Sequence, residues 1–375
     1  MSFLIPAAVI LLIAVFLIPL RKRGQASRRR GIRFDERDIS FARHNLKEGT
    51  PEYRDYYSRK PDIEDPDRRT RALPGLLSPV SKYYEPLNSA AADASFFIVE
   101  NLRDAAEGEP GEKREDLSDS RVLKYLMKWI EHSGADCAGA GRITADCWYS
   151  HVGRGTGVYG EEILSEHGNA IVIGCGMDPE LTRSAPESSE VVEAALRYSD
   201  CAVAAVQAAQ FLRNLGYHAR AHIDGNYRVI AAEAARQAGL GSFGWSGLLL
   251  HRKYGPAVRY SVVTTDLSVP QRSEKEESVL NFCRICKKCV ENCPSHSISS
   301  EEPGCVNTDR CFAYWNAVGT DCGVCIAVCP MGHPWGILKK IAMKSQLAAR
   351  LLILFDDMVY SKKHKSRRGT EKWKK

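Results

Sequence analysis

Eight of the thirteen cysteines fall in two runs near the C-terminal end of the chain. The first run reads C-x2-C-x2-C-x3-C-P and ends at Pro294. In the second, ten residues separate Cys311 from a C-x2-C-x3-C-P run that ends at Pro330. In bacterial two-cluster ferredoxins, the fourth cysteine of such a run ligates the other 4Fe-4S cluster. On that pattern one cluster is held by Cys283, Cys286, Cys289 and Cys329, and the other by Cys293, Cys311, Cys322 and Cys325. The spacing therefore predicts two 4Fe-4S clusters and single-electron chemistry.

Two other uses of cysteine fit this spacing less well. Zinc ribbons carry two separated C-x2-C pairs without a proline-terminated triplet. Disulfide frameworks are typical of short secreted chains, whereas this chain has 375 residues. Cys305 could compete with Cys311 for a cluster, and the sequence around Cys311 favours Cys311. The other cysteines are expected to be small buried apolar residues, namely Cys137, Cys147, Cys175 and Cys201.

An uncharged apolar run extends from Phe3 to Leu20. It is just long enough to cross the hydrocarbon core of a membrane as one helix. Arginines and lysines crowd positions 21–30, so the positive-inside rule places the rest of the chain in the cytoplasm. The twin arginines Arg28-Arg29 follow the apolar run, whereas an export signal places them before it. We expect a single-pass anchor in the cytoplasmic membrane with the body facing the cytoplasm. The alternative is a buried core helix.

The net charge of +6 is unevenly distributed, because eight more basic residues crowd positions 362–375. Such clusters bind nucleic acid or anionic lipid headgroups. The apolar run beside the first cluster favours membrane lipid as the partner over nucleic acid. The stretch from Pro334 to Val359 predicts an amphipathic helix, which could lie on a membrane. Packing back on the body is the favoured interpretation, because such apolar stripes usually face a core.

Hydrophobic periodicity between these ends predicts helices that alternate with strands. Helices are predicted at 121–132, 189–215 and 229–239, and strands at 170–175, 217–222 and 258–265. This alternation indicates an α/β body. The polar, proline-dotted segment at 31–79 predicts an extended arm that packs on the body through Tyr53, Tyr56 and Tyr57. Plain disorder is the alternative for that segment.

Further blocks accompany the cysteines. Asp309-x-Cys311-x2-Tyr314-Trp315 precedes Asp321-Cys322-Gly323-x-Cys325-Ile326. Upstream, in order, stand Arg197-Tyr198-Ser199, Phe211-Leu212-Arg213-x-Leu215-Gly216-Tyr217, Ala238-Gly239-Leu240-Gly241, Tyr254-Gly255-Pro256-x2-Arg259 and Thr265-Asp266-Leu267. In these blocks the chain resembles the corrinoid-dependent reductive dehalogenases. The arm at Glu52-Tyr53-x2-Tyr56-Tyr57 is similar to the same family's N-terminal region. The cysteine spacing alone is shared with the related epoxyqueuosine reductases, and the Gly-Leu-Gly and Tyr-Gly-Pro blocks favour the dehalogenases.

The resemblance implies a nitroreductase-like α/β (α+β) core that binds base-off cobalamin, with a ferredoxin-like two-cluster domain beside it. The expected parts are a transmembrane anchor (1–20), a basic juxtamembrane segment with an extended arm (21–79), an α/β corrinoid and substrate domain (80–274), a domain with two 4Fe-4S clusters (275–335), and an amphipathic helix with a basic tail (336–375). No histidine is placed as a cobalt ligand, and His218 and His222 are expected to be ordinary packed or surface residues.

The resemblance also implies candidate site residues. Tyr198 occupies the position of the family's proton-donating tyrosine, although a tyrosine packed on a long helix is an equal alternative. Asp224 or Asn226 lies where the family has a polar pocket residue. The family carries a basic residue shortly after Gly-Leu-Gly, whereas this chain has Trp245, which cannot supply a charge. Trp245 could form an aromatic wall of the cofactor pocket. A substitute for the missing cation could be Arg252, Lys253 or Arg220.

The sequence therefore predicts a membrane-anchored oxidoreductase that passes electrons through two clusters to a corrinoid, which reduces a small organic substrate, halogenated or not. A low-potential donor is expected, either ferredoxin, flavodoxin or a quinol-linked protein. The main alternative is a two-cluster electron-transfer protein without dehalogenase activity. The other alternative is an epoxyqueuosine-reductase-like enzyme acting on tRNA, for which the basic tail is the only support.

Overall fold

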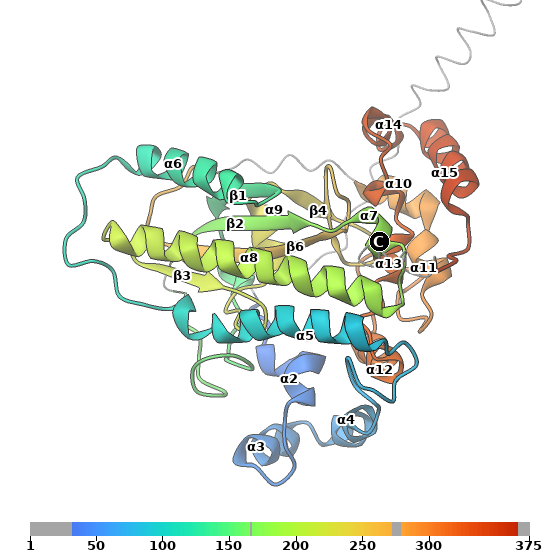
Figure 1. Cartoon of the computed structure of the whole chain (residues 1–375), viewed down its shortest axis with the longest axis horizontal. Helices are drawn as coiled ribbons and strands as arrows, with labels where there is room; N and C mark the ends of the chain where they lie inside the picture. Colours follow the sequence, from blue (N-terminus) through green and yellow to red (C-terminus); the bar gives the residue numbers. More distant parts are fainter. Residues whose placement is uncertain (1–31, 166, 272–278, 367–375) are drawn as a thin grey trace, which may run out of the picture.

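A computed structural model describes residues 32–165, 167–271 and 279–366 (Figure 1). The predicted anchor at 1–20 and most of the basic segment after it lie outside the described residues. Within the described ranges, no helix combines the length and the apolar character that a membrane span requires.

The strands are β1 (Cys137–Arg142), β2 (Asn169–Gly176), β3 (Ala219–His222), β4 (Gly241–Phe243), β5 (Leu249–His251) and β6 (Val258–Thr265). The helices before the cysteine runs are α2 (Ser40–His44), α3 (Pro51–Arg59), α4 (Glu64–Arg71), α5 (Pro86–Asn101), α6 (Asp119–His132), α7 (Pro179–Thr182), α8 (Ser188–Asn214) and α9 (Ala231–Gln237). Those in and after the runs are α10 (Val279–Cys286), α11 (Lys288–Asn292), α12 (Thr308–Val318), α13 (Val324–Ala327), α14 (Ile337–Ala342) and α15 (Gln346–Tyr360). Short 3-10 turns lie at Glu36–Asp38, Pro61–Ile63, Asp104–Ala106, Ala145–Cys147 and Pro330–Gly332.

The body is built on a four-stranded sheet with the order β1-β2-β6-β3, in which every neighbouring pair is antiparallel. Helix α8 covers one face, where its alanines pack on Ile171 and Ile173, and α9 covers the other, where Ala234 packs near Val172. Helix α5 lies along the outer side of α8 (Figure 1). The sheet is therefore sandwiched between helical layers.

The antiparallel pairing corrects the α/β interpretation of the body to α+β. Strands β2 and β3 are both antiparallel to β6, so they run parallel to each other and α8 connects them as a crossover helix. Strand β6, which comes later in the chain, is inserted between them. The sequence showed the crossover unit but not this insertion, because the position of a later strand in the sheet leaves no local pattern.

Helix α8 agrees with the predicted helix at 189–215 and ends where glycine permits it. Leu215 caps the helix, and Gly216 follows with a left-handed φ of +82°. A Cβ at Gly216 would lie 2.5 Å from the Cα of Arg114, so this position needs glycine for space as well as for conformation. The predicted strands at 170–175 and 258–265 are confirmed as β2 and β6.

The arm at 31–79 is helical, which corrects the prediction of an extended segment. Pro51 occupies the first turn of α3, where a missing N–H costs nothing, and the side chain of Thr50 caps that helix. The prolines are therefore helix starts, not breaks. Tyr53, Tyr56 and Tyr57 are all buried, but chiefly within the arm, where they pack on one another and on Leu46 and Ile63, with Tyr159 of the body beside them.

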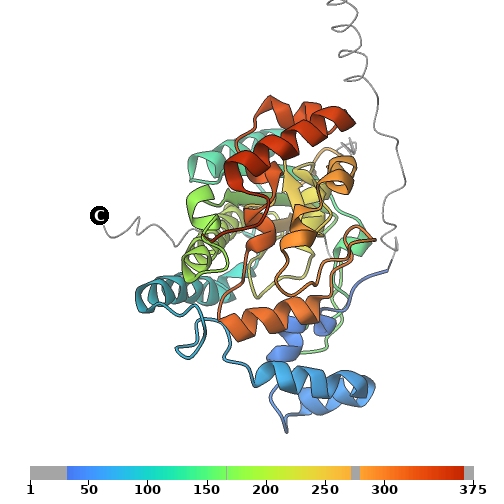
Figure 2. The ribbon, with the colours of Figure 1, turned by 90° about the vertical axis from the view of Figure 1, so that its right-hand side faces the viewer.

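The arm joins the cluster region through α2 and α12. Ser40 Oγ donates to Asp309 at 2.7 Å, and the Arg43 guanidinium pairs with Asp309 and with Asp67. The ring of Phe41 packs on that of Phe312 with centroids 4.6 Å apart. The earliest described segment thus rests on the helix that carries Cys311, and Figure 2 shows the arm directly beneath α12.

The C-terminal stretch forms two helices where one was predicted. Ser345 separates α14 from α15 by capping the second helix. Within α15, Asp356 is fully buried and accepts hydrogen bonds from Lys288 at 2.6 Å, His333 at 2.5 Å and Trp335 at 2.7 Å. This carboxylate fastens α15 to the cysteine loops. Burial alone would raise its pKa, but the three hydrogen bonds outweigh burial and hold the pKa of Asp356 below its usual value.

Asp356→Asn is expected to destabilise the protein by about 3–5 kcal/mol at neutral pH, because it leaves Lys288 buried with a weakened partner. A depressed carboxyl pKa adds stability above the unfolded-state pKa, and that stability is lost as pH falls through the folded-state pKa. The deficit should therefore shrink in acid. Denaturant unfolding at several pH values measures it. Asp357→Asn is the matched control, because Asp357 also bonds Lys288 but is only partly buried. Equal unfolding of the Asp356 variant and the unmodified protein at neutral pH would contradict the assignment.

Candidate active site

The predicted ligand cysteines lie on short helices and the turns between them. Cys283 and Cys286 belong to α10, Cys289 to α11 and Cys325 to α13. The backbone turns through left-handed conformations at Lys287 with φ +53°, at Cys322 with φ +65° and at Gly323 with φ +65°. Such conformations are costly for residues other than glycine. Because backbone strain concentrates at functional sites, their clustering beside the cysteines indicates a functional site.

The predicted ligand thiols lie near one another, and we name them by the two ligand sets that the sequence predicts. Burial raises the pKa of Cys329, and the neighbouring thiols of Cys283, Cys286 and Cys289 raise it further. Burial likewise raises the pKa of Cys325. The nearby thiols raise it further, those of Cys322 and Cys311 more than those of Cys289 and Cys293. The Cys289 thiol raises the pKa of both Cys325 and Cys329, so the two groups are adjacent. We call them the first group (Cys283, Cys286, Cys289, Cys329) and the second group (Cys293, Cys311, Cys322, Cys325).

Backbone N–H groups point at several of these sulfur atoms. Cys286 accepts from the N–H of Lys288, Cys322 from that of Val324, and Cys293 Sγ from the N–H of Ser297 at 3.3 Å. Hydrogen bonds to cluster sulfur ligands favour the charged thiolate and tune the reduction potential. Buried thiols with raised pKa values need such donors, or a bound metal, to ionise.

Within the described part of the chain, no three Cys, His, Asp or Glu side chains converge as the ligands of one metal ion would. In a four-iron cluster each cysteine binds a different iron atom, so the four sulfur atoms stand apart around the cluster. A donor set of four thiols with backbone donors fits a cubane cluster in each group. The assignment of each cysteine to a cluster remains a prediction.

Tyr198 lies on α8 beneath the guanidinium of Arg259 from β6, whose Cζ is 4.9 Å from the centre of the phenol ring. Burial raises the pKa of Tyr198 to about 12, and the cation of Arg259 opposes that rise. Among the described side chains and backbone groups, none bonds the phenol oxygen. The ring is therefore fixed by a cation while its hydroxyl stays available as a donor.

Arg259 connects Tyr198 to the second cysteine group. Its guanidinium lies 3.0 Å from Asp321, the residue before Cys322, and 3.9 Å from the fully buried Glu190. Burial and the neighbouring Asp321 raise the pKa of Glu190 well above its usual value. Glu190 also fills the space over Gly323, where a Cβ would lie 2.5 Å from its carboxyl carbon. One ion pair therefore spans from the tyrosine site to the loop of the second group.

Two further charges act on the same tyrosine, Arg154 from the loop at 153–160 and Asp224 from the turn after β3. Asp224 and Arg154 both act on the pKa of Tyr198, in opposite directions. Arg154 is held by the fully buried Glu36 of the arm, whose carboxylate also accepts the N–H of Gly153 at 2.9 Å. Asp224 is partly exposed, and no described residue bonds its carboxylate. The site thus combines an available phenol, an available carboxylate and two fixed guanidinium groups.

The other predicted site residues lie elsewhere. Asn226 is fully buried with a satisfied amide, which accepts from Thr156 N at 3.2 Å and donates to Arg103 O at 3.2 Å. Trp245 packs with the first group, where its backbone N–H bonds Cys283 and Lys287 lies over its ring. Both remain predicted cofactor contacts, but neither adjoins Tyr198 through any bond or ring contact of the described residues.

The structure places the cation of Arg259 over the ring of Tyr198, and the sequence did not name this residue, while Arg252, Lys253 and Arg220 remain predictions. Arg220 pairs with Glu107, and Lys253 bonds Tyr254. The ring of His222 is fully hydrogen-bonded, to Arg228 N and Thr264 Oγ1, as expected for a packed residue. Arg259 was visible in the sequence only as the last residue of the Tyr-Gly-Pro block, and its partner Glu190 gave no signal, since both contacts depend on tertiary packing.

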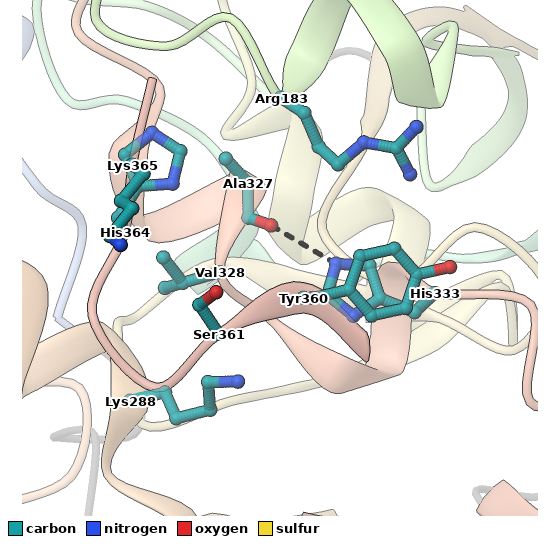
Figure 3. Close-up of a pocket in the computed structure, with 9 residues that line it drawn as sticks. All are labelled: Arg183, Lys288, Ala327, Val328, His333, Tyr360, Ser361, His364 and Lys365. Carbon is teal, nitrogen blue, oxygen red and sulfur yellow. Dashed lines mark hydrogen bonds between the residues drawn. The ribbon is translucent and has the colours of Figure 1, made fainter. Parts of the chain in front are cut away.

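A small cavity of about 30 Å³ lies between residues of α11, α13 and the end of α15, and Figure 3 shows the residues that line it. It holds no more than a few water molecules, so it is not a substrate pocket. Its lining includes Arg183, His333 and Tyr360, and the ring of His333 bonds the carbonyl of Ala327 at 3.1 Å. We place the candidate active site at Tyr198, because its phenol and the carboxylate of Asp224 have no bonding partner among the described residues.

Arg259→Met is expected to destabilise the protein more as pH rises. Without the guanidinium, the buried Glu190 and its neighbour Asp321 lose their cation, and a buried acid with a raised pKa favours the folded state only while it stays protonated. The loss at neutral pH should be about 3–5 kcal/mol. Thermal unfolding between acid and neutral pH tests this, with Arg259→Lys as the control that keeps a charge. A deficit independent of pH would contradict the proposed ion-pair network.

Comparison with known proteins gives one consistent group of relatives. No family model matches the chain. A tetrachloroethene reductive dehalogenase of Desulfitobacterium hafniense is 36% identical over 171 residues, covering 40% of this chain and 31% of that relative. The enzyme of the same name from Sulfurospirillum multivorans is 32% identical over 184 residues, covering 44% and 36%. An epoxyqueuosine reductase of Lactococcus garvieae is 30% identical over 125 residues, covering 29% and 34%.

Solved structures give the same result for the fold. A reductive dehalogenase whose structure suggests a mechanism for B12-dependent dehalogenation matches with a TM-score of 0.71 and 22% identity, over 90% of this chain and 48% of that one. The chain spans about a third of the length of the curated relatives it matches. The similarity to reductive dehalogenases and epoxyqueuosine reductases that the motifs predicted is confirmed.

Proposed function

We propose that this chain, which is similar to reductive dehalogenases in sequence and fold, is a cobalamin-dependent iron–sulfur reductase anchored in the membrane. It would take electrons from a low-potential donor and reduce a small halogenated organic substrate. The observation that carries the proposal is the position of Tyr198, which lies under Arg259 with an available hydroxyl, one ion pair away from the second cysteine group.

The cysteines supply the electron path. Four thiolates of each group would hold one 4Fe-4S cluster, and a cluster transfers one electron at a time. The two groups are adjacent, since Cys289 of the first acts on Cys325 of the second. Asp321, which precedes Cys322 of the second group, pairs with Arg259. Electrons arriving at the first group would therefore pass to the second and then to the side of the sheet where Tyr198 lies.

The tyrosine supplies a proton. Reductive removal of a halide consumes two electrons and one proton and releases the halide, so a proton must reach the carbon that loses the halogen. With a pKa raised to about 12, Tyr198 is neutral at physiological pH and can donate. The phenolate left behind would be stabilised by the guanidinium of Arg259 and, at longer range, by Arg154. Asp224, which is open to solvent, is placed to return a proton to the phenol.

The cofactor supplies the remaining chemistry. When bound, a corrinoid provides low-valent cobalt, which can reduce a carbon–halogen bond. Trp245, Asp224 and Asn226 are its predicted contacts, and Asp224 is the one that lies beside Tyr198. The sequence lacks the basic residue that accompanies the tyrosine in the family, because Trp245 stands in its place. Arg259 would supply the missing positive charge beside Tyr198.

Anaerobic purification with cobalamin tests the proposal. We expect about eight irons per chain, one corrinoid, and a cobalt signal in electron paramagnetic resonance that changes on addition of a halogenated substrate. A preparation with full iron that binds no corrinoid under any condition would instead support the two-cluster electron-transfer protein.

The match to an epoxyqueuosine reductase favours a second candidate function. An enzyme of that kind would bind tRNA with an affinity that falls steeply with salt. Binding of tRNA by the purified protein, measured across a salt series, separates this candidate from the first. We favour the first because the dehalogenases match longer segments at higher identity.

A further inference from the structure

Helices α14 and α15 lie at the edge of the molecule beside the cysteine loops (Figures 1 and 2), and they carry large apolar side chains that are exposed to solvent. Seven such side chains on the two helices are more than a third exposed, and Met358 and Ile337 reach 74% and 70%. We call them the apolar face: Ile337, Leu338, Ile341, Leu354, Phe355, Met358 and Val359. Single exposed apolar residues are ordinary, but a contiguous group on paired helices marks a surface that another apolar phase covers.

The opposite side of the same helices is fixed to the cysteine region, where residues of both groups pack. Ala342, Ala349 and Leu352 are buried in the cluster that contains Cys283 and Cys293. Asp356 adds the hydrogen bonds to Lys288, His333 and Trp335 described above. The apolar face is therefore not a loose segment that could turn inward, because its inner side is already occupied.

The rim of the apolar face is basic. Lys340, Lys344 and Arg350 are exposed on the two helices, and Lys362 and Lys363 follow α15 directly. The acidic residues of this stretch are engaged, because Asp356 is fully buried and both it and Asp357 pair with Lys288. Outside the two helices, Lys362 lies 3.7 Å from the carboxylate of Glu291, in an ion pair that is open to solvent. An apolar centre with exposed cations beside it, and with its own acidic residues engaged, complements a membrane surface that carries anionic headgroups.

We propose that the apolar face is a membrane-docking surface, which lies in the interface of an anionic bilayer and holds the first cysteine group next to it. An electron-carrier protein fits less well, because such transient interfaces are small and polar. The apolar run at 3–20 and the basic residues at 21–30 point to the same lipid surface. The inference rests on the membrane association proposed above. It adds that the body docks as a fixed unit and accepts electrons from a donor in the bilayer.

Labelling with a lipid-soluble photoactivated carbene reagent, followed by peptide mapping, tests the proposal on the full chain reconstituted in vesicles. In vesicles with anionic lipid, label is expected in peptides covering 337–341 and 354–359. In neutral vesicles this labelling should fall roughly tenfold or more, because each lysine near an anionic surface contributes about 1 kcal/mol. The peptide covering 3–20 is an internal standard, since it tests the proposed anchor separately.

The double variant Phe355→Glu with Met358→Glu should lose the labelling at 354–359 and keep it at 3–20. Leu87→Glu with Phe97→Glu is the matched control, because these α5 side chains are also exposed, at 66% and 60%, but lie away from α15. That control should leave labelling at 354–359 unchanged. Label at 3–20 with none on α14 and α15 would overturn the inference while leaving the anchor intact. Label on α14 and α15 with none at 3–20 would support the inference and contradict the anchor.

Discussion

Tyr198→Phe is expected to lower the rate of substrate reduction by about 10²–10⁴-fold, the usual contribution of a general acid. The phenol has no bonding partner among the described residues, and its pKa is raised to about 12. It therefore keeps its proton until the carbon that loses the halogen becomes basic enough to take it. The substitution keeps the ring under Arg259 and removes only the hydroxyl. Iron and corrinoid content should therefore equal those of the unmodified protein, and steady-state turnover under anaerobic conditions measures the loss.

Tyr227→Phe is the matched control for that experiment. Tyr227 is also buried near Tyr198, but its hydroxyl is committed to the carbonyl of Tyr260 at 2.8 Å. It should cost about 1 kcal/mol of stability and little turnover. A Tyr198 variant that turns over at the normal rate would show that the proton comes from elsewhere, and Asp224 would then be the next residue to test.

Cys286→Ser and Cys325→Ser are each expected to remove about half of the iron and to abolish turnover. A hydroxyl in place of a thiolate weakens the hold on one cluster, and an electron path with one cluster missing is interrupted. Iron analysis and the optical and magnetic spectra of the anaerobic protein measure the loss. The two variants should lose different spectral components, because Cys286 belongs to the first group and Cys325 to the second.

Cys305→Ser is the matched control for the cysteine variants. Cys305 is exposed, unlike the predicted ligands, and should leave the iron content unchanged. Loss of iron from Cys305→Ser, with retention in Cys311→Ser, would reassign the fourth ligand of the second group. Full iron in both Cys286→Ser and Cys325→Ser would contradict the two-cluster assignment altogether.

The sequence predicted the elements that carry a strong local signal. Helix α8 has alanines spaced to cover a sheet and a glycine just past its end, so its bounds followed closely. Strand β6 is a β-branched run and was located residue for residue. Helix α5 and the hairpin β4–β5 were missed. Helix α5 has apolar residues around its circumference and small ones where it meets α8, while β4 and β5 are only three residues each.

In the candidate site, too, the residues that belong to a local sequence pattern were predicted, and those that depend on tertiary contacts were not. Cysteine spacing is a local pattern, so the eight candidate ligands could be named from the sequence alone, and their division between two clusters remains a prediction. Tyr198 was found only through a resemblance, because one tyrosine on a long helix has no distinguishing neighbours in sequence. Arg259 lies 61 residues after Tyr198 in the chain, and it meets Tyr198 and Glu190 only once β6 is inserted beside β2. Residues that act through tertiary contacts of this kind cannot be inferred from a single sequence.

The contact between α2 and α12 has a consequence for biosynthesis. Ser40 and Asp309 are 269 positions apart, so the arm can dock only after nearly the whole chain has left the ribosome. Until then Phe41 has no aromatic partner, and the helix that bears Cys311 is uncovered on that side. Long-range closure of this kind is slow. Cys322, Cys325 and Cys329 leave the ribosome later still, so docking of the arm and completion of both predicted ligand sets depend on the same late part of the chain.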